Sequence, residues 1–159
     1  MPYALGAQSR ARLKGVHPQL VRVVERAIEI SPQDFLVLEG VRTPQRQRQL
    51  YGQGRTRQEL ARAGVDVSLA KPSEGKVTWT LISNHFVKAD GYGHAVDLAP
   101  YPVDWEGPTR FPKFDAIAKA MFQAARELGI GLRWGADWDR DGKPRERGET
   151  DSPHFELAA

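Results

Sequence analysis

The chain contains no cysteine among its 159 residues, and this absence limits what it can fold into more than any other feature. Disulfides, thiolate zinc sites, iron–sulfur clusters and cysteine nucleophiles are all excluded. A chain of this length suits one domain and can bury an apolar core without cross-links. Any transition-metal site must therefore use histidine and carboxylate side chains. The histidines are His17, His85, His94 and His154.

Hydrophobic periodicity predicts a mixture of helices and short strands. Residues 17–30 and 114–128 place apolar side chains along one helical face, and Gly129 follows as a helix stop. A polar helix is expected from Thr43-Pro44 through Tyr51, and a short helix near residues 58–63. Short strand-like runs occupy residues 35–40, 77–82, 95–98, 132–134 and 155–157. These patterns predict one α+β domain.

The charge balance is mildly basic. Lys and Arg number 23 and Asp and Glu number 20, which gives a net charge of +3 and favours an anionic partner such as a wall polymer or nucleic acid. The sequence shows no basic stripe beside a recognition helix or stacking aromatics, so a nucleic-acid module is not favoured. Residues 1–16 carry no long apolar run. We therefore expect neither a signal peptide nor a membrane anchor.

Three separated pieces carry the side chains for hydrolytic chemistry. They are residues 83–85 (SNH), 93–97 (GHAVD) and 151–156 (DSPHFE). Catalytic zinc takes three protein ligands and leaves a further position open, and His85, Asp97 and His154 could supply those ligands. A carboxylate beside the metal's water can take its proton and pass it to a leaving amine, and Asp151 is placed to do this.

These motifs resemble the LAS-type zinc peptidases, which cut the peptides of bacterial peptidoglycan. That family includes D-alanyl-D-alanine carboxypeptidases and phage L-alanyl-D-glutamate endopeptidases. Its pattern combines S-x-H, G-x-A-x-D and a carboxylate three residues before a late histidine. Its upstream G-x-R-[ST]-x-x-x-Q is matched by residues 40–47 (GVRTPQRQ). Residues 16–43 and 132–138 (LRWGADW) are similar to the phage branch, so the resemblance covers nearly the whole chain.

The resemblance implies a fold and a set of roles. The fold is Hedgehog/D-Ala-D-Ala-peptidase-like, with a short antiparallel sheet and flanking helices in a single domain over residues 1–159, without a separate wall-binding domain. Asp151 would be the general base and then the acid. Arg42 would hold a substrate carbonyl or carboxylate and steady the oxyanion. Gln47, Ser83 and Trp134 are further candidates for substrate binding.

Several of these residues have a structural alternative. Arg42 could form only a salt bridge, and Gln47 could merely support its own segment. Trp134 and Trp138 could either wall the cleft or pack in the core. Glu156 lies two residues after His154, so strand alternation places it on the same face, where it could bond that ligand.

The spacing of the first two metal ligands departs from the family pattern. His85 and Asp97 are twelve positions apart (97 − 85), whereas the pattern H-x-x-G-x-A-x-D has seven. An insertion within residues 86–92 (FVKADGY) accounts for the difference, since loop closure entropy grows slowly with length. The alternative makes His94 the ligand. We favour His85, because strand alternation puts Ala95 and Asp97 on one face and His94 on the other.

A second metal site is expected in residues 137–142 (DWDRDG). Asp137, Asp139 and Asp141 place oxygens at alternate positions before a glycine, as at the start of a calcium loop. An EF-hand would have glutamate at the twelfth position, where this chain has Gly148, although Glu146 and Glu149 lie nearby. Some phage members of the family have a calcium-responsive loop here. The alternative is an acidic surface turn.

The sequence as a whole predicts a zinc peptidase that cuts peptidoglycan stem peptides. The leading hypothesis is a monomeric phage endolysin that cleaves the L-Ala–D-Glu bond during host lysis. It would be made in the host cytoplasm and reach the wall after another protein opens the membrane. The alternatives are a D,D-carboxypeptidase of the same fold, a non-catalytic wall-binding module and a basic nucleic-acid binder.

Overall fold

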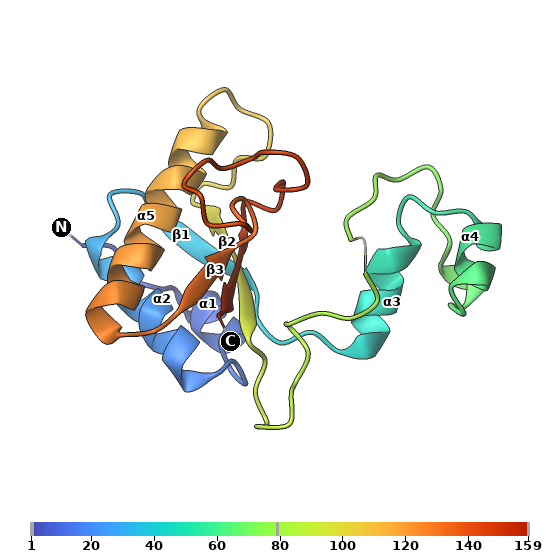
Figure 1. Cartoon of the computed structure of the whole chain (residues 1–159), viewed down its shortest axis with the longest axis horizontal. Helices are drawn as coiled ribbons and strands as arrows, with labels where there is room; N and C mark the ends of the chain where they lie inside the picture. Colours follow the sequence, from blue (N-terminus) through green and yellow to red (C-terminus); the bar gives the residue numbers. More distant parts are fainter. Residues whose placement is uncertain (1, 79, 159) are drawn as a thin grey trace.

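A computed structural model describes residues 2–78 and 80–158 of the chain. A body of helices packed on a sheet continues into a smaller lobe, formed by residues 44–78, that extends to one side (Figure 1). The helices are α1 (Ala7–Arg12), α2 (Pro18–Ile30), α3 (Pro44–Gly52), α4 (Arg57–Arg62) and α5 (Arg110–Leu128), with a 3-10 turn η1 (Val67–Leu69). The strands are β1 (Phe35–Glu39), β2 (Ala95–Pro100), β3 (Leu132–Trp134) and β4 (His154–Leu157).

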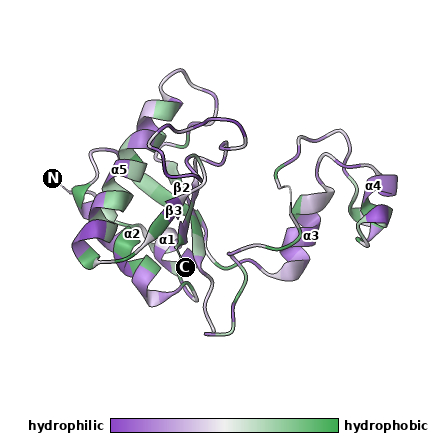
Figure 2. Cartoon of the chain, in the orientation of Figure 1, coloured by the Kyte–Doolittle hydropathy of each residue, from purple (hydrophilic) through white to green (hydrophobic). Residues whose placement is uncertain are grey.

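The long helices form where the apolar periodicity predicts them. The buried face of α2 consists of Leu20, Val23, Val24, Ala27 and Ile28. Its first turn is capped by His17, whose Nδ1 accepts a hydrogen bond of 3.1 Å from the backbone N–H of Gln19. Helix α5 ends at Gly129, which adopts the left-handed conformation (φ +68°) that glycine tolerates. The apolar residues of these helices concentrate in the body, whereas α3 and α4 are largely hydrophilic (Figure 2).

The four strands form one antiparallel sheet in the order β1-β2-β4-β3. Val96, Leu98 and Phe155 point into the hydrophobic core that the sheet shares with the helices. Strand alternation turns Asp97 and His154 to the opposite face, where they lie directly across from each other in the β2–β4 register. The sheet thus has one face for the core and one face for polar chemistry. This architecture confirms the predicted α+β fold with a short antiparallel sheet.

A bulge in β1 redirects its last residue. The register passes from Val37 opposite Leu98 to Glu39 opposite Asp97, so Leu38 is an extra residue in the strand. Strict alternation would place Glu39 on the core side together with Val37. The bulge turns Glu39 to the polar face instead, beside Asp97.

The predicted strand over residues 77–82 is wrong for the part that the structure describes. Residues 77–78 and 80–82 contain no strand, and Trp79 lies outside the described residues. Thr78 Oγ1 accepts from the N–H of Thr80, and Thr80 Oγ1 accepts from the N–H of Ile82. The segment therefore satisfies its backbone locally as it returns from the lobe to the body.

Two further features concern the helices. Helix α1 is not predicted from periodicity, because six residues are too few to show a helical repeat. In the part of the chain that the structure describes, no helix is long and apolar enough to cross a lipid bilayer.

Candidate active site

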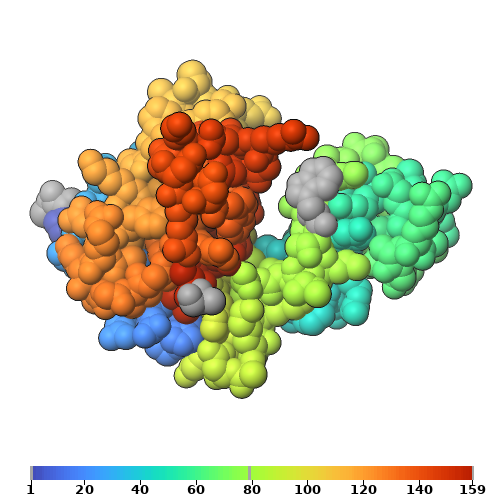
Figure 3. Space-filling model, in the orientation of Figure 1, coloured from blue at the N-terminus to red at the C-terminus, as the bar shows by residue number. Residues whose placement is uncertain are grey.

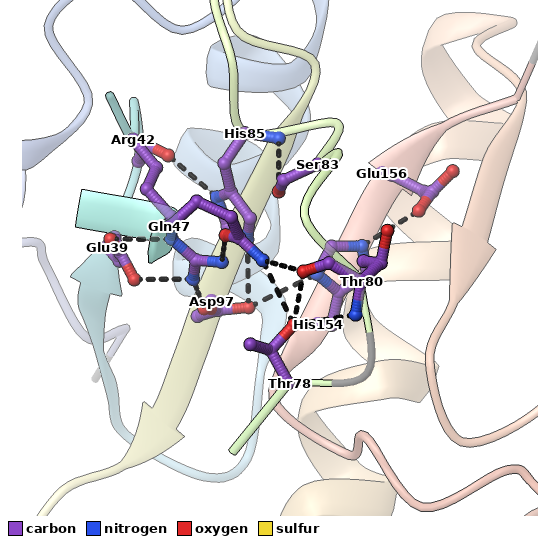
Figure 4. A network of polar contacts seen from close by, with 11 residues as sticks. Glu39, Arg42, Gln47, Thr78, Thr80, Ser83, His85, Asp97, His154 and Glu156 are labelled. Carbon is purple, nitrogen blue, oxygen red and sulfur yellow. Dashed lines mark hydrogen bonds and ion pairs between the residues drawn. The ribbon is translucent and has the colours of Figure 1, made fainter. Parts of the chain in front are cut away.

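His85, Asp97 and His154 converge on the polar face of the sheet (Figure 4). Oδ1 of Asp97 lies 3.3 Å from Nε2 of His85 and 3.3 Å from Nδ1 of His154. Strands β2 and β4 supply two of these side chains, and the loop that precedes β2 supplies His85. The structure therefore brings together the three residues that the sequence nominated as metal ligands.

The ring nitrogens that do not face Asp97 are already engaged. Nδ1 of His85 lies 2.7 Å from the backbone oxygen of Gly40, to which it donates. Nε2 of His154 lies 2.8 Å from Oε1 of Glu156. In the neutral rings, these bonds leave a lone pair on each nitrogen that faces Asp97. Among the described residues, Nε2 of His85 and Oδ1 of Asp97 are buried and have no hydrogen-bond partner.

Facing lone pairs in a buried site repel one another unless a cation lies between them. Two ligands of a tetrahedral zinc ion, each about 2.0–2.1 Å from the metal, are about 3.3 Å apart, which matches both separations from Asp97. Metal-bound histidines also characteristically donate their other N–H to a carbonyl or carboxylate, as His85 and His154 do here. The residues present therefore fit a zinc ion.

Without a metal, the charges in this cluster shift the proton equilibria. Burial lowers the pKa of His154, but its contacts with Asp97 and Glu156 outweigh burial and raise the pKa to about 10. Burial raises the pKa of Asp97, but its contacts with His154 and His85 hold it well below the usual range. A metal must therefore displace a proton from His154 when it binds.

Asp151 lines the same pocket of about 270 Å³ as the three ligands. Desolvation in this concave site and the negative charge of Asp97 raise its pKa, against the effect of the neighbouring cationic groups. Its backbone N–H donates to the oxygen of Gly135 (3.1 Å), and its own backbone oxygen accepts from the N–H of His154 (3.1 Å). The candidate base and one ligand are therefore held by the same short turn.

Arg42 is anchored mainly by Glu39. Its Nε and Nη2 donate to the two carboxylate oxygens of Glu39 at 2.9 and 2.7 Å. Nη2 also lies 3.4 Å from Oδ2 of Asp97, and Nη1 donates to Oε1 of Gln47 at 2.7 Å. The guanidinium thus holds the oxygen of Asp97 that does not face the histidines.

Gln47 is fully buried and uses its amide inside the protein. Its Nε2 donates to Oγ1 of Thr78 (3.0 Å) and to the backbone oxygen of Thr80 (2.6 Å), while Oε1 accepts from Arg42. The side chain lines the pocket, but these bonds tie helix α3 to the segment that enters the site. Among the described contacts, this arrangement matches the structural alternative for Gln47.

The two predicted tryptophans differ in position. Trp134 is a correction to the candidate substrate-binding set, because it is buried in the core, stacks on Phe155 and donates Nε1 to the oxygen of Ser152 (2.7 Å). Trp138 lines the pocket. Ser83 also lines it, and its Oγ accepts from the N–H of His85 at 3.1 Å.

His94 lies in a different cluster from Asp97. Its Nε2 is 2.6 Å from Oδ2 of Asp90, and His17 completes that group. Strand alternation had placed His94 away from the face of Asp97, and the structure has this arrangement.

The acidic loop after β3 gathers its carboxylates. Ligand atoms of Asp137, Asp139 and Asp141 lie within 4.8 Å of one another, as do those of Asp139, Glu146 and Glu149. Oδ1 of Asp137 and Oε1 of Glu149 are buried, and no described residue forms a hydrogen bond with either atom. Desolvation and the neighbouring acids raise the pKa of Asp137.

Sequence reasoning missed two residues that shape the site. Glu39 was hidden because only the β1 bulge turns it toward Arg42. Asn84 donates to Oε2 of Glu156 at 2.7 Å and so orients the carboxylate that bonds His154. The SNH motif contains Asn84, but the family pattern leaves that position variable, so only the geometry reveals the contact.

Comparisons with known proteins give relatives of the family that the motifs resemble. Residues 1–158 match a family model described as phage L-alanyl-D-glutamate peptidase. The L-alanyl-D-glutamate peptidase of Escherichia phage T5 is 34% identical over 163 residues, which cover 99% of each protein. The crystal structure of the Serratia marcescens L-Ala D-Glu endopeptidase ChiX has a TM-score of 0.62 and 37% identity, covering 96% of this chain and 87% of that one. These matches confirm the resemblance drawn from the motifs, and the chain belongs to the phage L-alanyl-D-glutamate peptidase family.

Proposed function

We propose that this chain is a zinc-dependent endolysin that hydrolyses the L-Ala–D-Glu bond of peptidoglycan stem peptides. The observation that carries the proposal is the convergence of lone pairs from His85, Asp97 and His154 in one pocket with Asp151. The names of the phage T5 and Serratia relatives support this choice of bond.

Each catalytic step has a residue positioned for it. Zinc bound by the three ligands supplies Lewis acidity, which polarises a carbonyl and lowers the pKa of water. The carboxylate of Asp151 takes the proton from the attacking water and then delivers it to the leaving amine. Its raised pKa suits both roles, because a carboxylate whose pKa lies closer to the working pH is a stronger base and can still return the proton as an acid.

Arg42 contributes in two ways. It holds Asp97 through Oδ2, which fixes the orientation of that ligand. A guanidinium has five N–H groups, and the described contacts of Arg42 use four of them. The remaining N–H of Nη1 is available to bind a substrate carbonyl or carboxylate oxygen.

A hollow of larger volume adjoins the metal pocket and could hold an extended peptide. The hollow beside Asp151, of about 740 Å³, is lined by Thr78, Trp138 and Thr150 and shares residues with the metal pocket. Figure 3 shows the space between the lobe and the red loop that follows β3. Substrate would lie along this hollow with its scissile bond near Asp151.

Digestion of purified peptidoglycan, followed by mass analysis of the released fragments, tests this function. Zinc-loaded protein should generate new N-terminal D-Glu, and Asp151→Asn should generate far less of it in the same time. Released D-Ala would favour the D,D-carboxypeptidase alternative instead. A zinc-loaded, folded protein that leaves the peptidoglycan uncut would contradict both enzyme hypotheses.

We further propose that the acidic loop binds calcium. Oδ1 of Asp137 and Oε1 of Glu149 are buried and accept no hydrogen bond within the described part of the chain, and hard oxygen ligands suit Ca²⁺. Calcium should raise the melting temperature of the wild type, because a ligand that binds only the native state stabilises it. Glu149→Gln should abolish that shift, whereas Asp66→Asn, in the lobe, should retain it. An unchanged melting temperature in millimolar calcium would contradict the proposal.

The partner and place of action remain part of the same proposal. The chain would act as a monomer on the peptidoglycan of the wall, after another protein releases it from the host cytoplasm. The lobe over residues 44–78 carries seven Lys or Arg and three Asp or Glu. This local excess of positive charge favours an anionic wall polymer.

A further inference from the structure

We infer that His17, Asp90 and His94 form a second site for a divalent transition-metal ion, with zinc as its leading occupant. One ligand atom from each of these residues lies within 4.8 Å of the other two. Two imidazoles and one carboxylate are the same donor set as in the first cluster, and this set suits zinc. The second cluster shares no residue with the first.

The three side chains come from different parts of the chain and meet through one carboxylate oxygen. Oδ2 of Asp90 lies 2.6 Å from Nε2 of His94 and 3.8 Å from Nε2 of His17. The two imidazole rings are close, with centroids 5.2 Å apart. His17 precedes helix α2, Asp90 lies in the segment between the two ligands of the first site, and His94 directly precedes β2.

The backbone holds this arrangement in place before any metal binds. The N–H of His17 donates to the oxygen of Gly93 at 2.9 Å, and the N–H of His94 donates to the oxygen of Asn84 at 2.8 Å. Oδ1 of Asp90 accepts from the N–H of Tyr92 at 3.0 Å, which leaves Oδ2 to face the histidines. The three side chains that would bind the ion therefore need only small movements to surround it.

The separations suit a small ion after modest adjustment. The two nitrogen–oxygen distances of 2.6 and 3.8 Å lie on either side of the roughly 3.3 Å between ligands of tetrahedral zinc. His17, Asp90 and His94 are each partly exposed, so water can complete the coordination. The ion would replace the present contact between Asp90 and His94.

One feature makes this site weaker than the first. Nδ1 of His17 accepts the N–H of Gln19, so the neutral ring carries its proton on Nε2. Binding through Nε2 moves that proton to Nδ1 and removes the helix cap. We therefore expect the second zinc equivalent to bind less tightly than the first.

The location gives the site a structural role. Residues 86–92 contain the residues that lengthen the segment between His85 and Asp97 relative to the family pattern. A metal shared by Asp90, His17 and His94 would fasten this segment to the start of α2. It would thereby restrain the backbone that leads into both ligands of the first site.

Zinc titration of the full-length, metal-free protein tests the inference. Calorimetry in excess calcium, which keeps the acidic loop occupied, should show two equivalents of zinc, the second binding more weakly. Imidazole NMR resonances of His85 and His154 should shift with the first equivalent, and those of His17 and His94 with the second. A single equivalent, or a second one that leaves His17 and His94 unshifted, would overturn the inference.

Variants that preserve the local structure separate metal loss from misfolding. Asp90→Asn keeps the acceptor for the Tyr92 N–H, and His17→Asn keeps a helix cap, but each removes a metal ligand. Both should weaken the second equivalent by at least about tenfold and leave the first unchanged. Gln19→Ala, which keeps all three ligands, should retain both equivalents. Full second-equivalent affinity in both ligand variants would overturn the site.

Discussion

Nε2 of His85 and Oδ1 of Asp97 lie 3.3 Å apart, and both are buried without a hydrogen-bond partner in the part of the chain that the structure describes. The other ring nitrogen of His85 donates to Gly40, so the neutral histidine has no proton to offer to Asp97. An unpartnered pair of buried acceptors is costly in a folded protein. A metal ion bound between these two atoms would remove this cost. This contact therefore predicts that His85, and not His94, is the metal ligand.

The first prediction separates His85 from His94. His85→Ala should abolish the tight zinc equivalent and peptidoglycan cleavage, because it deletes one of three ligands. His94→Gln should keep the tight equivalent and the cleavage. Equilibrium dialysis with metal analysis, on protein shown to be folded by circular dichroism, checks both variants. Loss of the tight equivalent in His94→Gln alone would show that the ligand is His94.

The second prediction concerns Asp151. Asp151→Asn should keep tight zinc binding but lower kcat by about 10²–10⁴-fold, the usual contribution of a general base. Zinc affinity and cleavage rate are measured on the same preparation. Asp66→Asn is the matched control, since asparagine can keep the turn bond that Asp66 makes to Ser68, and it should retain both properties. Near wild-type turnover in Asp151→Asn would remove Asp151 from the mechanism.

The third prediction asks whether Arg42 contacts substrate or only positions Asp97. In Arg42→Lys, the lysine cannot form the bidentate contact with Glu39, so the variant should lower kcat/KM by about 10–100-fold. Glu39→Gln leaves the guanidinium in place, so it should cost less if Arg42 also binds substrate. Steady-state kinetics on a stem-peptide substrate compares the two. Equal losses would indicate that Arg42 acts only through Asp97.

The sequence predicts the parts of this protein that follow local rules. Helices α2 and α5 follow from the spacing of their apolar residues, and β2 and β4 from short apolar runs. Alternation along β2 and β4 also places Asp97, His154 and Glu156 on one face. The fold class and the family were therefore accessible before the structure.

The remaining features depend on contacts between distant segments. The bulge at Leu38 reverses the side to which Glu39 points, and no local pattern marks it. Trp134 looked equally suited to a cleft wall and to the core, and its stacking on Phe155 decides for the core. The residues from 77 to 82 have high strand propensity, but they pair with no strand among the described residues. The strand predicted from their propensity was therefore wrong.

The fourth prediction concerns pH and the metal-free protein. The pKa of His154 is raised from 6.5 to about 10 in the folded state, so the charged ring stabilises the fold. That stabilisation is fully present below about pH 6.5 and is lost as the pH rises toward 10. Chelator-treated protein should therefore lose stability toward urea across this range. His154→Gln should lack this component, and a wild-type profile identical to that of the variant would contradict the assignment.

The fifth prediction concerns Gly135, which lies against the turn that holds Asp151 and His154. A β-carbon there would clash with the backbone oxygen of Asp151 and lie 3.0 Å from Cβ of His154. Gly135→Ala should therefore displace the base and a ligand together, weakening zinc binding and cleavage and lowering the free energy of unfolding by about 1–3 kcal/mol. Gly75→Ala is the control, because no atom of the described residues, apart from its own chain neighbours, lies within 4 Å of its added carbon. Urea unfolding, zinc titration and peptidoglycan cleavage are measured for both. If the two variants gave the same unfolding free energy, zinc affinity and cleavage rate, the close packing of Gly135 against the turn would not position Asp151.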